Sequence, residues 1–469
     1  MPFRPIVYAS VCASILAIVS GEPVIAADST PWLAPGTQLS FHGTVAKASK
    51  DQTPAEPEKT FDLTILVAAA AADGSAQVYW LLDESGRGGW GWIDSAGSWS
   101  LDKLGRASAG VGPALLYDRG EGTSIIGFDS PLLLSPDVFS VGAKWNAGSL
   151  KHEVLARETV AVSTGDANQQ REAWKVSAAN NYGYKRTQWV DDAGLVLQLS
   201  ERVFMGRGEE YELTWKLAAV EKLAPEALAE RNAQFSALLE VVASLKREAR
   251  TEAAELKEAE LAALAASLPQ AQQVITTGPL VKLLAAAKSD LSVQKDRASE
   301  VAEMAARFEG KPAPMFSLEG LAGAKLADAD LKGQVTILHF WDYRDEPLRE
   351  PYGQIGYLDF LFDKRKADGV KVYGVAVDAR LADEAKRGAA ARSAGKLVSF
   401  MNLSYPLLLD AGTVLKQFGD PRLVGAQLPL FVVIDAEGKI AHYFVGCYEV
   451  DRDAGLKQLN EVLNATLKK

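Results

Sequence analysis

Residues 335–341 read VTILHFW, and this apolar run decides the fold of the last third of the chain. A short, continuous apolar run of this kind is typical of a strand that is buried on both faces of a sheet. A second apolar run covers residues 370–377, and the stretch 352–367 between the two runs has the amphipathic spacing of a helix. The order strand, helix, strand predicts an α/β sheet.

The rest of this region continues the pattern. Two more apolar runs, 430–434 and 440–445, flank the cluster of turn residues at 435–439, which predicts two strands joined by a turn. An amphipathic stretch at 454–467 predicts a closing helix. We therefore expect one α/β domain over residues 309–469.

Four sequence landmarks occur in this region in the order GKPAPMF at 310–316, LKGQV at 331–335, HFW at 339–341 and LPLFVVID at 428–435. In this order they resemble the TlpA/ResA-like group of exported thioredoxin-fold proteins, which are related to the redoxins of the AhpC/TSA type. The resemblance covers about a third of the chain. It implies a thioredoxin-like fold and, for the family, thiol-disulfide oxidoreductase activity.

The chain departs from the family at its redox motif. The family places Cys-x-x-Cys shortly after the Phe-Trp pair, and here those two cysteine positions fall on Asp345 and Leu348. Thiol-disulfide exchange needs a thiolate that attacks and a second thiol that resolves the mixed disulfide. An aspartate and a leucine supply neither thiol, so we expect a degenerate active site without dithiol redox activity.

The substituted residues suit the start of a helix. Asp345 can cap the free backbone N–H groups, Glu346 adds negative charge at the positive end of the helix, and Pro347 is tolerated in the first turn. An alternative is that the two carboxylates act as an acid and a base or bind a cation. Because no histidine ligands lie nearby, the motif predicts no metal site and no cofactor.

The resemblance also implies a binding groove. It implies that Pro429 is cis and that its loop faces the active-site helix, where backbone groups meet an extended peptide or protein segment. The candidate binding residues at this groove are Trp341, Glu346, Pro347, Leu428, Pro429 and Gly446.

The chain has two cysteines, Cys12 and Cys447. Cys447 directly follows the predicted strand 440–445 and Gly446. One hypothesis is that its thiol forms a mixed disulfide with a partner. The other is that Cys447 is a buried or half-buried structural residue, because free cysteines behave as small apolar side chains.

The N-terminus has the pattern of a secretory signal peptide over residues 1–27. Arg4 precedes an apolar run at 6–19, and small residues follow at Ala26 and Ala27. The run is shorter than the ~20 residues that span a bilayer, so we expect cleavage and an exported protein, periplasmic or extracellular. No other stretch predicts a membrane span, and cleavage would remove Cys12, leaving no internal disulfide.

Residues 28–222 predict a mainly antiparallel β domain. Eight of the ten tryptophans lie between Trp80 and Trp215, and alternating runs at 186–190 and 195–199 flank the hairpin signal 191–194. The tryptophans at 90, 92 and 99 are typical of sheet packing; the alternative is a sugar- or peptide-binding surface. No family resemblance covers this domain.

Residues 223–308 are rich in Ala, Glu, Leu and Lys and predict a long helical hairpin. Pro225 suits a helix start, and neither Gly nor Pro follows until Pro269, which predicts a helix of about 44 residues with coiled-coil spacing. Gly278-Pro279 starts a second helix that runs to Phe308. We interpret the pair as a spacer; the alternative is a dimerisation or docking coiled coil.

The chain is thus predicted as multidomain α+β, with a net charge of −10 that argues against nucleic acid as a partner. The leading hypothesis is an exported protein whose thioredoxin-like domain is a binding or structural module and does not catalyse dithiol redox chemistry. A second hypothesis is a divergent oxidoreductase that uses a single cysteine. A third is that the β domain carries an apolar or glycan ligand, although no ligand motif supports it.

Overall fold

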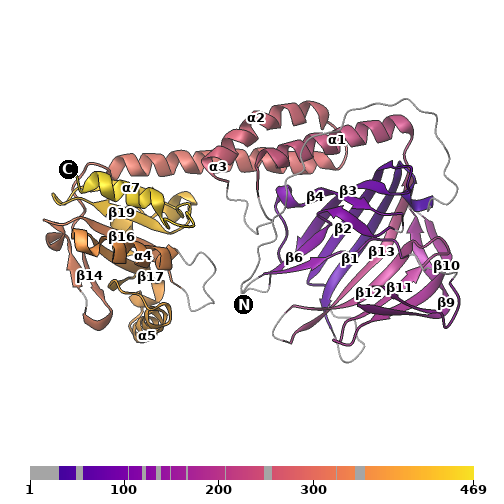
Figure 1. The fold of residues 1–469 in the computed structure, drawn as a ribbon, viewed down its shortest axis with the longest axis horizontal. Helices are drawn as coiled ribbons and strands as arrows, with labels where there is room; N and C mark the ends of the chain where they lie inside the picture. The colour runs from indigo at the N-terminus through magenta and orange to yellow at the C-terminus, as the bar shows by residue number, and fades with distance from the viewer. Residues whose placement is uncertain are drawn as a thin grey trace. The chain divides into compact units, whose positions relative to one another are not determined.

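The computed structural model describes residues 31–48, 56–103, 105–118, 123–133, 139–147, 149–164, 167–205, 208–247, 256–323, 325–343 and 354–468. The chain divides into two compact units (Figure 1). The first contains residues 1–117 and 124–239, and the second contains residues 118–123 and 240–469. Among the described residues, no helix is both long enough and apolar enough to cross a membrane.

The first unit is built on one eleven-stranded sheet with the order β5-β4-β3-β2-β1-β13-β12-β11-β10-β9-β8. All the strand pairs described in it are antiparallel, which confirms the predicted sheet type. The strands are β1 (Thr37–Lys47), β2 (Lys59–Ala70), β3 (Ala76–Gly86), β4 (Ala96–Leu101), β5 (Ala107–Gly110), β8 (Lys144–Ala147), β9 (Leu150–Thr164), β10 (Ala167–Ala179), β11 (Lys185–Val190), β12 (Val196–Phe204) and β13 (Glu210–Lys222). A separate hairpin joins β6 (Ala114–Asp118) and β7 (Thr123–Gly127).

The predicted hairpin between β11 and β12 is present. The carboxylate of Asp191 accepts hydrogen bonds from the backbone N–H groups of Ala193 (2.9 Å) and Leu195 (2.8 Å). Gly194 supplies the positive φ of 87° that closes the turn. The short polar side chain and the glycine therefore fix this turn locally.

The tryptophans of the first unit lie in its core. Trp80, Trp99 and Trp215 belong to one cluster of buried residues. Trp90 and Trp92 are also buried, and the indole N–H of Trp90 donates to the carbonyl of Ala114 at 2.6 Å. These side chains pack the sheet rather than form an exposed ligand surface.

The helical region differs from its prediction. Instead of one helix that reaches Pro269, it forms α1 (Pro225–Ser244), α2 (Glu258–Val274) and α3 (Leu280–Phe308). The N–H groups of Leu245 and Lys246 bond three residues back, and Lys246 has a φ of 51°, so the helix tightens and ends there. The prediction of a single helix of about 44 residues is wrong, and Pro269 lies inside α2 rather than at its end.

The helices pack against other elements of the chain. In the first unit, the ring of Phe235 on α1 stacks on Tyr79 of β3 at 4.8 Å. In the second unit, α2 contacts α3. Between α1 and α2, Ala249 lies outside the described residues and Leu256 precedes the first residue of α2.

The second unit contains the predicted α/β sheet, with the order β15-β14-β18-β17-β16-β19-β20. The central pairs β16–β17 and β17–β18 are parallel, and β19 and β20 are antiparallel to their neighbours. The strands are β14 (Ser317–Gly320), β15 (Lys325–Ala327), β16 (Thr336–Asp342), β17 (Lys371–Val377), β18 (Leu407–Asp410), β19 (Leu430–Ile434) and β20 (Ile440–Val445). The helices are α4 (Ile355–Arg365), α5 (Glu384–Met401), α6 (Thr413–Gln417) and α7 (Lys457–Thr466).

The end of α3 belongs to the core of this second unit. Met304 is buried in the same apolar cluster as Phe418, and the ring of Phe308 stacks on Tyr443 of β20 at 5.5 Å. Glu309 follows the helix, and its carboxylate accepts the backbone N–H of Tyr443 at 2.9 Å. The last turn of α3 is therefore part of the packing of the sheet.

Candidate functional site

The resemblance positions the redox motif directly after the end of β16. Trp341 is only 2% exposed and packs edge-to-face on Tyr343, with ring centroids 5.5 Å apart. Both rings belong to an apolar cluster with Ile355 and Leu397. Trp341, which was expected on the wall of the groove, therefore lies in the core.

The residues that replace the redox motif follow β16 in the sequence. The stretch 344–353 lies outside the described residues, and it includes Asp345, Glu346, Pro347 and Leu348. The predicted helix cap and the loss of dithiol activity stay predictions.

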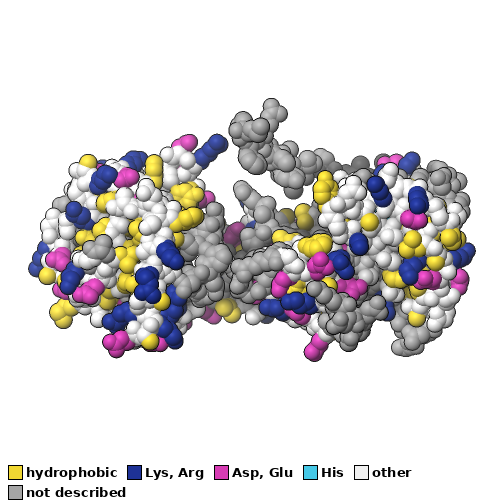
Figure 2. Space-filling view, turned by 90° about the horizontal axis from the view of Figure 1, so that it is seen from below, with side chains coloured by type: hydrophobic (Ala, Val, Ile, Leu, Met, Phe, Trp, Pro, Cys, Tyr) yellow, Lys and Arg dark blue, Asp and Glu magenta, His cyan; other side chains and the backbone are white. Residues whose placement is uncertain are grey.

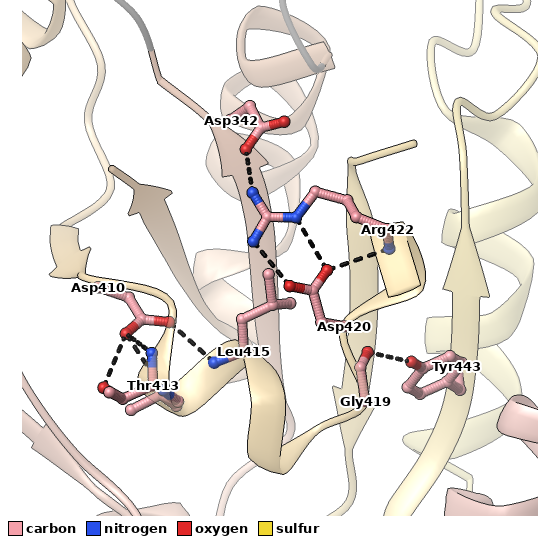
Figure 3. Close-up of polar contacts among 9 residues, drawn as sticks. Asp342, Asp410, Thr413, Leu415, Gly419, Asp420, Arg422 and Tyr443 are labelled. Atoms are coloured by element: carbon pink, nitrogen blue, oxygen red, sulfur yellow. Dashed lines mark hydrogen bonds and ion pairs between the residues drawn. The ribbon is translucent and has the colours of Figure 1, made fainter. Parts of the chain in front are cut away.

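Arg422 joins the end of β16 to the segment that leads to Pro429 (Figure 3). Its guanidinium Nη1 contacts the carboxylate of Asp342 at 2.8 Å, and its Nη2 contacts Asp420 at 2.7 Å. The backbone N–H of Arg422 also donates to Asp420, at 3.1 Å. Two segments distant in sequence are thus held together by one arginine.

The charges in this network shift the protonation of its members. Burial alone would raise the pKa of Asp420, but the hydrogen bonds and the charge of Arg422 outweigh burial and lower that pKa. The hydrogen bond to Asp420 raises the pKa of Arg422, which burial by itself would lower. Both groups are therefore charged at neutral pH.

Two further contacts fix the segment that precedes Arg422 (Figure 3). The buried carboxylate of Asp410 accepts the N–H groups of Thr413 at 2.9 Å and Leu415 at 2.8 Å, which caps the start of α6. The hydroxyl of Tyr443 donates to the carbonyl of Gly419 at 2.9 Å. The chain from β18 to Pro429 is therefore anchored at several points.

The Leu428–Pro429 peptide bond is cis, as the resemblance implies. Pro429 is buried, and its carbonyl accepts the N–H of Gly446 at 2.8 Å. Gly446 adopts a φ of 104°, which favours glycine. The structure thus brings together Leu428, Pro429 and Gly446, three of the residues predicted for the groove.

A cavity of roughly 860 Å³ lies beside this cis-proline. Residues 426–429 and 444–447 form one wall. Residues from the start of α2 and the middle of α3 line the rest, including Leu261, Arg297 and Val301. The helical region, which lies before the part of the chain that resembles redoxins, therefore contributes to the candidate site.

Hydrogen bonds hold the helical wall in place. The guanidinium of Arg297 donates to the carbonyl of Gly425 at 3.1 Å. The side chain of Gln294 accepts the N–H of Leu256 at 2.7 Å and donates to Asp290 at 2.6 Å. These contacts, all within the second unit, fix the wall that lies opposite Pro429.

Cys447 is exposed and lines the same cavity, so the expectation of a buried or half-buried residue is wrong. The segment that follows it is held firmly: the side chain of Gln354 accepts the N–H of Tyr448 at 2.8 Å and donates to its carbonyl at 2.7 Å. Gln354 is 1% exposed. The backbone next to Cys447 is thus fixed from the start of α4.

The residues that organise this site were not found by sequence reasoning. The Asp-Pro-Arg sequence at 420–422 signals a turn but not the contact of Arg422 with Asp342. Nothing in the sequence near Gln354 or Arg297 signals a partner far along the chain. Among the described residues, no group of three or more His, Cys, Asp or Glu side chains is arranged to hold a metal ion.

The face shown in Figure 2 carries basic and acidic side chains on both units, interspersed with apolar ones. The cavity beside Pro429 is a concave site of the second unit lined by both apolar and polar residues, as ligand sites commonly are.

Comparison with known proteins supports the sequence resemblance. Residues 310–443 match the AhpC/TSA family. The thiol-disulfide oxidoreductase ResA of Bacillus subtilis (strain 168) is 27% identical over 138 residues, which cover 29% of this chain and 68% of that protein.

Solved structures are similar to the same region. A putative thiol:disulfide interchange protein DsbE from Chlorobium tepidum is 27% identical, with a TM-score of 0.26, and the match covers 34% of this chain and 97% of that one. A putative thioredoxin from Neisseria meningitidis is 23% identical, with a TM-score of 0.26 and coverage of 34% and 95%. The C-terminal third of the chain is accordingly a thioredoxin-like domain of the redoxin type, related through residues 310–443 to the AhpC/TSA family.

Proposed function

We propose that this is an exported binding protein whose thioredoxin-like domain lacks dithiol redox activity. The observation that carries the proposal is the cysteine content: the 469 residues hold only Cys12 and Cys447, and no Cys-x-x-Cys occurs. Exchange by the dithiol route needs two thiols within reach of one substrate disulfide. Removal of the expected signal peptide 1–27 would leave one thiol in each molecule.

The cavity beside Pro429 supports a binding role. Its wall includes three of the residues predicted for the groove, namely Leu428, Pro429 and Gly446. Concave, largely apolar sites with a few polar groups are the usual location of ligands. The partner first expected at this site is an extended peptide or protein segment.

A second candidate function rests on the exposure of Cys447. In this alternative, the Cys447 thiolate attacks a partner disulfide, forming a mixed disulfide and releasing one partner thiol. An external small-molecule thiol then attacks the mixed disulfide, which regenerates Cys447 and leaves the external thiol bound to the partner. This route needs only one protein cysteine.

Insulin reduction with dithiothreitol separates the two functions. We expect the full mature chain and its Cys447→Ser variant to give the same rate as dithiothreitol alone, because neither carries a cysteine pair. A thioredoxin with an intact Cys-x-x-Cys is the positive control. A rate well above background that disappears in Cys447→Ser would establish the single-cysteine enzyme instead.

A further inference from the structure

The size and composition of the cavity beside Pro429 suit a small molecule. Its volume of roughly 860 Å³ falls within the range of about 300–1,000 Å³ that small-molecule sites occupy. Ten of the seventeen residues that line it are apolar, among them Leu261, Val301 and Phe444. Most of a ligand's surface would therefore contact apolar side chains.

The charged residues on the cavity wall favour an anion. Lys257 and Arg297 line the cavity, against the single carboxylate of Glu258. This excess of positive charge occurs in a chain whose net charge is −10, so the cavity differs in sign from the protein as a whole. Of these two basic residues, Arg297 donates to a neutral carbonyl, that of Gly425, at 3.1 Å, and the ammonium of Lys257 lies 4.0 Å from the exposed carboxylate of Glu449.

Part of the backbone beside the cavity is already hydrogen-bonded within the chain. A peptide that adds to a strand edge is held mainly by backbone hydrogen bonds. Here the carbonyl of Pro429 and the N–H of Gly446 bond to each other at 2.8 Å. The facing wall includes α3, whose backbone groups bond within the helix. The site therefore suits a ligand that needs apolar contact and one charged anchor.

We propose that this cavity binds a small amphipathic carboxylate, with an aliphatic tail against Leu261, Val301 and Phe444 and its anionic group near Lys257 and Arg297. The proposal rests on the proposed binding function and names its ligand class. It involves no covalent step.

Isothermal titration calorimetry of the full chain with decanoate tests the proposal, with 1-decanol as the uncharged probe. We expect one decanoate per chain and weaker binding of decanol. Ala302 is exposed and lines the cavity, so Ala302→Phe fills the site without disturbing the core and weakens decanoate binding at least tenfold. Ala285→Phe is the matched control, because Ala285 is exposed on the same helix but does not line the cavity.

The charge requirement is tested separately. Lys257→Gln should weaken decanoate binding several-fold and leave decanol binding unchanged, whereas Lys295→Gln, an exposed change on α3 away from the cavity, should alter neither. Equal binding of decanoate to Ala302→Phe and the native chain, or no binding at all, overturns the proposal.

A peptide probe separates this failure from a failure of the proposed function. If carboxymethylated insulin B chain binds at the cavity and decanoate does not, the site takes peptides: the small-ligand proposal is wrong and the binding function stands. Disulfide-reductase activity in the insulin assay would instead refute the proposed function, whatever decanoate does.

Discussion

The guanidinium of Arg422 lies 2.8 Å from the carboxylate of Asp342, although 80 residues separate them in the chain. The same guanidinium holds Asp420, which is 4% exposed. The contact ties the end of β16, after which the family carries its redox motif, to the segment that leads into Pro429.

Replacement of Arg422 by Gln should destabilise the second unit by about 1–3 kcal/mol, because it leaves the buried carboxylate of Asp420 without its charged partner. Urea denaturation followed by circular dichroism measures the loss. Arg392→Gln, an exposed change on α5, serves as the control and should shift the midpoint little. Equal midpoints for the two variants would contradict the role assigned to Arg422.

Protonation of Asp420 should lower the stability of the folded protein as the pH falls. Its folded pKa is lowered from the ordinary value of 3.8, so its contribution is complete above that pH and is lost as the pH falls through the lower folded value. Urea midpoints compared at pH 6 and pH 3 should therefore differ less in Asp420→Asn than in the native chain. Glu437→Gln, an exposed control, should keep the native difference. A pH dependence unchanged by Asp420→Asn would contradict the prediction.

Cys447 should react with Ellman's reagent without denaturant, because it is exposed on the cavity wall. In the mature chain, one thiol per molecule is expected to react, and Cys447→Ser should give none. The absorbance of the coloured thiolate that the reagent releases follows the reaction. A thiol that reacts only in denaturant would show that Cys447 is inaccessible in solution.

Gln354→Ala should both destabilise the second unit and alter Cys447. It removes both hydrogen bonds to the backbone of Tyr448, and each group left buried without a partner costs about 1–3 kcal/mol. The release of this segment should speed thiol labelling of Cys447. Gln334→Ala removes a surface hydrogen bond and is the control for both measurements. Labelling at the native rate in Gln354→Ala would show that the two bonds do not hold Cys447.

The sheet of the second unit was predictable because its signals are local. The apolar runs at 335–341 and 430–434 lie within one residue of β16 and β19, since a buried strand needs apolar residues on both faces. The predicted turn after β11 holds because Asp191 and Gly194 act within the turn itself. In each case the residues that determine the structure are neighbours in sequence.

The site was less predictable because its contacts join distant segments. The roles of Arg422 and Gln354 depend on partners 80 and 94 residues away, which no spacing rule reveals. The end of α1 was missed for a similar reason, since no Gly or Pro marks it. Trp341 was assigned to the groove by resemblance, whereas its burial follows from packing against Tyr343.

Because Phe308 stacks on Tyr443, the packed core of the second unit extends to residues that lie before the family match. The family match begins at residue 310. Gly419 nevertheless packs closely against Phe308 and Met304: a Cβ atom on Gly419 would lie 2.8 Å from the ring of Phe308. A fragment cut at the family boundary would expose this apolar surface to water. The last turn of α3 is therefore part of the interior of the second unit, although it lies before the family match.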